Sequence, residues 1–103
     1  MLTDEDMKGS MIDNLRMFYT IKTNKTYCNY KPIQINIEPT NICNLHCSFC
    51  PRDDLERPKG YMDFDFFKEI IDKNHRFIDK SEIHMYVFGE SMLHPKIYDM
   101  IAY

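Results

Sequence analysis

One segment of the chain reads Ile33-Gln-Ile-Asn-Ile-Glu-Pro-Thr-Asn-Ile-Cys43 and continues Asn-Leu-His-Cys47-Ser-Phe-Cys50. Its first half alternates isoleucine with Gln, Asn and Glu, which predicts a β-strand with one apolar and one polar face. Three cysteines in eight residues follow this strand directly. In folds built from parallel strands and helices, the loops at the carboxyl ends of the strands carry the active site. The segment therefore predicts a thiol-rich site on such a loop.

The three thiols indicate an iron–sulfur centre. Thiolates are the usual ligands of iron–sulfur clusters, and a cluster usually takes four of them. Cys43, Cys47 and Cys50 supply three on one short segment, with no obvious fourth. We therefore expect a cubane cluster with one iron left open, and an open iron is a binding position for a cofactor or substrate.

Other interpretations of the cysteines stay open. Their spacing also matches one face of a helix, on which cysteine is a small buried hydrophobe, although Pro39 and Pro51 disfavour a continuous helix there. A zinc site would take His46 or Cys28 as its fourth ligand, but the chain lacks the second ligand pair of most structural zinc sites. A disulfide is a further alternative, although three cysteines so close together make an awkward framework.

The rest of the chain predicts two strand–helix units preceded by a helix. We expect the first helix over residues 4–20 and a second strand over residues 82–88. Asp63 is expected to cap a helix that ends near Asn74, and Pro95 suits the first turn of a last helix. The apolar helix faces are expected at Met7, Met11, Leu15 and Phe18, at Phe66, Phe67, Ile70 and Ile71, and at Ile97, Met100 and Ile101.

Strands separated by a helix predict an α/β fold with parallel strands. In a βα barrel the helices cover the outer face of the sheet, and the inner face lines the lumen. We therefore expect the isoleucines of the first strand to face helices, and Gln34, Asn36 and Glu38 to face a lumen that holds a polar cofactor. Two parallel strands enclose no core and leave their edges exposed, which predicts that further units complete the domain.

The cysteine segment resembles a known family. Residues from Ile37 to Arg52 are similar to the radical S-adenosylmethionine (SAM) enzymes, whose signature is CxxxCxxC, and Phe49 fits the aromatic position before the third cysteine. Phe88-Gly-Glu-Ser91 resembles the GGEP motif of the same family, with Phe for its first glycine and Ser for its proline. Arg57-Pro-Lys-Gly-Tyr-Met62 resembles the connection between these motifs in members that carry a SPASM domain and in their relatives.

The resemblance implies a chemistry and its cofactors. Cys43, Cys47 and Cys50 would hold a [4Fe–4S] cluster, whose open iron binds SAM. Reductive cleavage of SAM would then give a 5′-deoxyadenosyl radical that abstracts hydrogen from a substrate, possible substrates being a peptide, a protein or a cofactor precursor. Glu90 and Gly89 would bind SAM through its ammonium group and by close backbone approach, and Phe49 would pack beside the cluster or the adenine.

The resemblance also implies a domain organisation and a partner. The fold would be the N-terminal portion of a (βα)6 TIM-like barrel, with a helical extension over residues 1–30 and the truncated start of the radical SAM core over residues 31–103. We expect the 103-residue chain to turn over poorly by itself, and a flavodoxin or ferredoxin to act as reductant. The alternatives are a non-catalytic iron–sulfur or zinc module, completion by a partner chain, and a decayed gene product.

Composition excludes other classes of function. The 13 basic and 16 acidic residues are well mixed and give a net charge of -3, so no basic stripe indicates nucleic-acid binding. The apolar runs are too short to cross a membrane, and the acidic N-terminus does not resemble a signal peptide. We therefore expect the reducing cytoplasm, where thiolates persist. Among the remaining polar residues, Arg52 is expected to be solvated, Cys28 to be a free thiol and His94 to lie at a helix entry.

Overall fold

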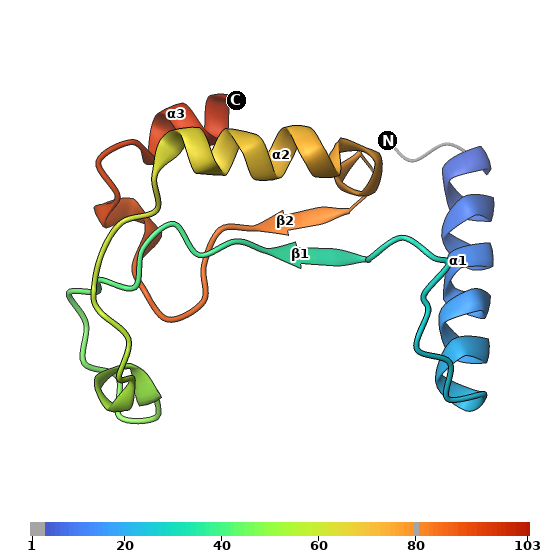
Figure 1. Ribbon diagram of the computed structural model, residues 1–103, viewed down its shortest axis with the longest axis horizontal. Helices are drawn as coiled ribbons and strands as arrows, with labels where there is room; N and C mark the ends of the chain where they lie inside the picture. Colours follow the sequence, from blue (N-terminus) through green and yellow to red (C-terminus); the bar gives the residue numbers. More distant parts are fainter. Residues whose placement is uncertain (1–3, 80) are drawn as a thin grey trace. The chain divides into compact units, whose positions relative to one another are not determined.

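A computed structural model describes residues 4–79 and 81–103 (Figure 1). The chain divides into two compact units, residues 1–32 and 33–103. In chain order, the elements are α1 (Asp4–Lys22), β1 (Gln34–Asn36), the 3-10 helix η1 (Pro51–Asp54), α2 (Phe64–Ile78), β2 (Glu82–His84), the 3-10 helix η2 (Ser91–Leu93) and α3 (Ile97–Ala102).

Helix α1 is the main element of the first unit and confirms the helix predicted over residues 4–20. It ends in a Schellman motif, in which Asn24 takes the left-handed conformation with φ 51°. The backbone N–H of Asn24 donates to Ile21 O at 3.3 Å, and that of Lys25 donates to Thr20 O at 3.1 Å. These bonds satisfy carbonyl groups that the helix end would leave without partners.

The apolar stripe of α1 is exposed. Met11, Leu15 and Phe18, which were expected on a buried face, each expose more than half of their surface. The side chain of Met7, the fourth member of the predicted stripe, lies outside the described residues.

Strands β1 and β2 form a two-stranded parallel sheet, in which Gln34 pairs with Glu82 and Asn36 with His84. The predicted parallel α/β arrangement of the two strands is confirmed, and α2 provides the crossover that parallel strands require. Both strands are shorter than the predicted ranges 33–38 and 82–88. The ladder ends because β1 runs into Pro39, which has no N–H to donate. The barrel of about six units stays a prediction.

Helix α2 begins where the sequence predicts it. The Asp63 carboxylate accepts the backbone N–H of Phe66 at 3.0 Å and so caps the first turn. The helix runs on to Ile78, four residues beyond the predicted end at Asn74. Asn74 is accommodated because its side-chain amide donates to Ile70 O at 2.8 Å, one turn back in the same helix.

Helices α2 and α3 lie on the same side of the sheet (Figure 1). The core of the second unit forms between them and the sheet, around Ile37, Phe67 and Met100. Ile33 and Phe66 were also expected to be buried by helices, but both are more than half exposed. Partly buried apolar side chains surround the core: Ile35, Met62, Phe64, Ile70, Ile71 and Met85.

His94 positions the start of α3. Its buried imidazole accepts the backbone N–H of Lys96 through Nδ1 at 3.0 Å, and its Nε2 lies 2.8 Å from Met62 O. The expectation of a helix-entry role for His94 is therefore confirmed. Pro95 lies before the helix rather than in its first turn, because α3 begins only at Ile97.

Candidate metal centre

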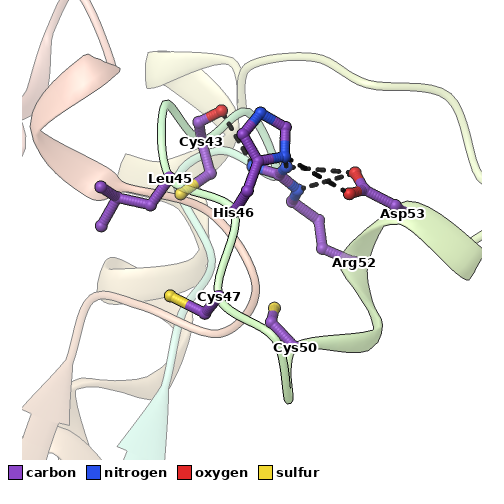
Figure 2. A pocket seen from close by; sticks show the side chains of 7 residues that line it. All are labelled: Cys43, Leu45, His46, Cys47, Cys50, Arg52 and Asp53. Carbon is purple, nitrogen blue, oxygen red and sulfur yellow. Dashed lines mark hydrogen bonds and ion pairs between the residues drawn. The ribbon is translucent and has the colours of Figure 1, made fainter.

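The three cysteines of the signature lie on one loop and line one hollow, as Figure 2 shows. All three are free thiols; Cys47 is exposed and the other two are half-buried. The loop contains no helix, so the interpretation of the cysteines as a buried helical stripe is wrong. A turn in which Cys50 N–H donates to Cys47 O at 3.1 Å leads into η1, which Pro51 begins.

The donor set of this loop fits a cluster better than a single ion. Among residues 4–79 and 81–103, no three Cys, His, Asp or Glu side chains converge closely enough to hold one metal ion. In a cubane cluster each cysteine binds a different iron, so three thiols spaced around a hollow fit this group. Cys43, Cys47 and Cys50 would hold it through three of its irons.

Arg52 is buried beside this loop. It was expected to be solvated, but only 6% of its surface is exposed. One guanidinium nitrogen, Nη1, donates to Cys43 O at 2.8 Å, and Nε and Nη2 donate to Asp53 Oδ1 at 3.2 and 3.1 Å. Arginine has five donors in a rigid fork, which lets it hold a backbone carbonyl and a carboxylate at once.

Asp53 is the counterion of this arginine. Hydrogen bonds and charge attraction from Arg52 hold the pKa of the Asp53 carboxyl below its usual value, and Lys59 and His46 add to the effect. The His46 ring Nδ1 lies 3.7 Å from Asp53 Oδ2 and 3.5 Å from Arg52 Nη2. His46 is therefore engaged at the rim of the hollow in the present arrangement (Figure 2).

A second loop, which follows β2, is fastened to the base of the cysteine loop. The Glu90 N–H donates to Ile42 O at 2.9 Å. A Cβ built on Gly89 would lie 1.9 Å from the Thr40 carbonyl oxygen, so no side chain fits between the two backbones. Gly89 was expected to make room for a cofactor, whereas the close approach that it permits here is to Thr40.

The Glu38 carboxylate makes a further connection between the two loops. One of its oxygens accepts the backbone N–H of Phe88 at 2.9 Å, and the other forms an ion pair with Arg57. Its side chain is only 14% exposed. Glu38 was expected to face a lumen, but its carboxylate takes the place of a backbone acceptor for the loop that follows β2. Gln34 and Asn36, on the same strand, are exposed.

Two buried polar residues hold the connection between the motifs. The Asn41 side-chain amide donates to Pro58 O at 2.9 Å, and its oxygen accepts Gly60 N–H at 2.8 Å. The Thr40 hydroxyl donates to Gly60 O at 2.7 Å. Residues such as Thr40 and Asn41 are typical of turns and helix caps, and the sequence alone predicted no long-range contact for them. Their position between a strand and the first cysteine was the available signal for a structural role.

The structure places the other candidate residues as follows. The Glu90 carboxylate accepts the backbone N–H of Met92 at 3.1 Å and caps η2, with no ion pair to Lys96 among the described residues. Phe49 is 90% exposed, so it is not an ordinary core aromatic. Cys28 is an exposed free thiol that belongs to the first compact unit.

Comparison with known proteins identifies the family. The family model described as the radical SAM superfamily matches residues 37–103, which is more than half of the chain. This chain belongs to the radical SAM superfamily. The match begins directly after β1 and covers the cysteine loop, α2, β2, the loop that follows β2, and α3, so these elements are those of a radical SAM domain.

One relative is a "Tungsten-containing aldehyde ferredoxin oxidoreductase cofactor-modifying protein" of Pyrococcus furiosus. The two are 35% identical over 65 residues, which make up 63% of this chain and 18% of the relative. The chain therefore spans less than a fifth of the length of this relative. No solved structure matches the chain significantly.

Membership of the radical SAM superfamily makes an enzyme function the general expectation, together with a [4Fe–4S] cluster and SAM as the cofactors of the family. In the described part of the chain, no helix has both the length and the apolar character needed to cross a bilayer.

Proposed function

We propose that this chain is part of an enzyme that reductively cleaves SAM at a [4Fe–4S] cluster and directs the resulting 5′-deoxyadenosyl radical to hydrogen abstraction from a substrate. The observation that carries the proposal is the arrangement of Cys43, Cys47 and Cys50. They are three free thiols around one hollow, on a loop that directly follows a parallel strand. Three protein ligands leave one iron of a cubane cluster open, and an open iron is the position that SAM requires.

The residues around the cysteines support a site for SAM. Glu90 lies on the loop fastened to the cysteine loop, and its carboxylate is a suitable partner for the SAM ammonium group. Because that carboxylate now caps η2, we propose that it shifts or shares its oxygens when SAM binds. Phe49 is an exposed aromatic ring next to the third cysteine, and we propose that it packs beside the adenine or the cluster.

We propose that the substrate is a cofactor precursor or a peptide. The name of the Pyrococcus furiosus relative, a cofactor-modifying protein, favours the first. The polar side chains of the strands, Gln34, Asn36 and Glu82, are exposed. We therefore expect little turnover from these 103 residues alone, and propose that further βα units of a six-unit barrel complete the substrate site.

We propose that a small redox protein such as a flavodoxin or ferredoxin delivers the electron. This partner fits the chemistry because the cluster must be reduced one electron at a time. Free thiols on an accessible loop require a reducing compartment, which supports a cytoplasmic location.

The test is anaerobic reconstitution of the chain with iron and sulfide, followed by EPR of the dithionite-reduced protein with and without SAM. We expect a cubane signal that changes on addition of SAM. The change C47A should abolish the signal, because it removes one of three ligands. The matched control C28A removes a thiol of the first unit and should leave the signal unchanged.

Two outcomes would contradict the proposal. A cubane signal that is indifferent to SAM would favour a non-catalytic iron–sulfur module. Uptake of one zinc ion per chain, with no cluster after reconstitution, would favour a structural metal site.

A further inference from the structure

Arg52 is a buried charge in the wall of the hollow that the three cysteines line. A guanidinium is rarely buried without a structural or functional reason, because removing its charge from water is unfavourable. Its Nη1 donates to the carbonyl oxygen of Cys43, the first ligand of the signature, at 2.8 Å. This bond joins the two ends of the cysteine loop and fixes a positive charge against it (Figure 2).

The charge of Arg52 is only partly balanced. Its partner Asp53 has a side chain that is 60% exposed, so water screens the carboxylate far more than the buried guanidinium. Asp53 is also shared with Lys59, whose Nζ lies 4.0 Å from it, and with His46 at 3.7 Å. The loop therefore experiences a net positive field from Arg52, which Asp53 reduces.

We propose that Arg52 and Asp53 set the reduction potential of the cluster held by Cys43, Cys47 and Cys50. This inference rests on the proposed function, since it requires that the cluster binds there. Reduction adds one electron from the protein reductant, with no bond made or broken and no proton transferred. A fixed positive charge stabilises the more negative, reduced form and raises the potential, whereas a nearby negative charge lowers it.

Arg52 is thus a positioning residue that acts on the cluster by its charge and on Cys43 by its hydrogen bond. The two effects are separable. The change R52K keeps the charge but loses the fork that holds a carbonyl and a carboxylate together. The change R52Q removes the charge and keeps a side chain that can donate to a carbonyl.

The experiment is an EPR-monitored redox titration of the reconstituted chain and its variants, with iron and sulfide content measured for each. We expect a more negative midpoint potential for R52Q and a more positive one for D53N. R52K should keep a midpoint near that of the unchanged chain but hold less cluster. The control is D54N, which removes the next carboxylate along η1; within the described residues Asp54 makes no ion pair, and its variant should leave the midpoint unchanged.

Opposite shifts in R52Q and D53N distinguish the proposal from loss of packing, which would change cluster content but not move the two midpoints in opposite directions. Fully loaded R52Q and D53N proteins with the midpoint of the unchanged chain would overturn the inference and leave the proposed function intact. If R52Q holds no cluster, the midpoint potential of D53N alone tests the inference: a more positive midpoint supports it and an unchanged midpoint overturns it. An unchanged chain that takes up no cluster would instead overturn the proposed function itself.

Discussion

Replacement of Gly89 by alanine tests the close fit between the two loops that follow the strands. The new Cβ would lie 1.9 Å from the Thr40 carbonyl oxygen, 2.6 Å from the Thr40 carbonyl carbon and 2.9 Å from Asn41 Cα. All three contacts are with backbone, which cannot move aside as the tip of a flexible side chain does. The two loops must therefore separate, and the hydrogen bond from Glu90 N–H to Ile42 O, 2.9 Å long, is stretched or lost.

The cost follows from these contacts. Forcing extra atoms into a packed site typically costs about 1–3 kcal/mol, and three backbone contacts below 3.0 Å place this change near the upper end. The lost hydrogen bond adds about 1 kcal/mol. With a urea m-value of about 1 kcal/mol/M for a small domain, the unfolding midpoint should fall by roughly 3–4 M, or the folded state should be lost altogether.

The assay combines urea unfolding with amide hydrogen exchange at Glu90. We expect G89A to lose most of the protection of the Glu90 amide. The control is G60A, because nothing lies within 4 Å of a Cβ built on Gly60 and its φ is not positive. G60A should be neutral or slightly more stable. A G89A protein as stable as G60A, with its Glu90 amide still protected, would refute the reasoning.

Three further predictions concern single contacts. D63A should destabilise α2 by about 1 kcal/mol in thermal unfolding, because the cap on Phe66 N–H is lost; an unchanged transition would contradict this. N41A should cost about 1–3 kcal/mol and expose the peptide bond after Lys59 to trypsin, since two buried hydrogen bonds to that segment disappear; equal digestion rates would contradict it. A hydrogen bond from Lys68 lowers the pKa of Asp65, so K68Q should raise the Asp65 pKa measured by NMR titration. Because the folded pKa is lowered, the ionised carboxylate stabilises the fold above its unfolded pKa, and this stabilisation is lost as the pH falls through the folded pKa.

The sequence predicts the elements whose signals are local. Asp63 followed by apolar residues at helical spacing gave the start of α2, and alternating isoleucines gave β1 and its parallel pairing through the crossover. The three cysteines also form a local signal, because they lie within eight residues of one another, and they predicted their own loop. Each of these predictions required only a residue pattern within one helical turn, one strand or one short loop.

The elements that were wrong depend on contacts between distant residues. The predicted strand over 82–88 stops at His84, and beyond it the Phe88 N–H bonds to the Glu38 carboxylate, fifty residues earlier in the chain, instead of to a backbone carbonyl. Arg52 was expected in solvent because its burial depends on how the loop curls around the Cys43 carbonyl. No local pattern encodes either contact. The sequence therefore predicted a solvated Arg52 and a Glu38 that faces a lumen.

These long-range contacts explain how one loop can be both firm and open. Its base, which comes before the first cysteine, is held by Glu38, by the fit of Gly89 against Thr40 and by the Asn41 amide. Its tip, from Leu45 to Phe49, is exposed. A cluster that must be inserted and must keep one iron accessible requires a tip that is open to its cofactor, whereas precise placement requires ligands on a rigid support. A substitution at the base that leaves the fold intact should therefore affect the placement of SAM while sparing assembly of the cluster, whereas substitutions of the cysteines should prevent assembly of the cluster and, with it, binding of SAM to the open iron.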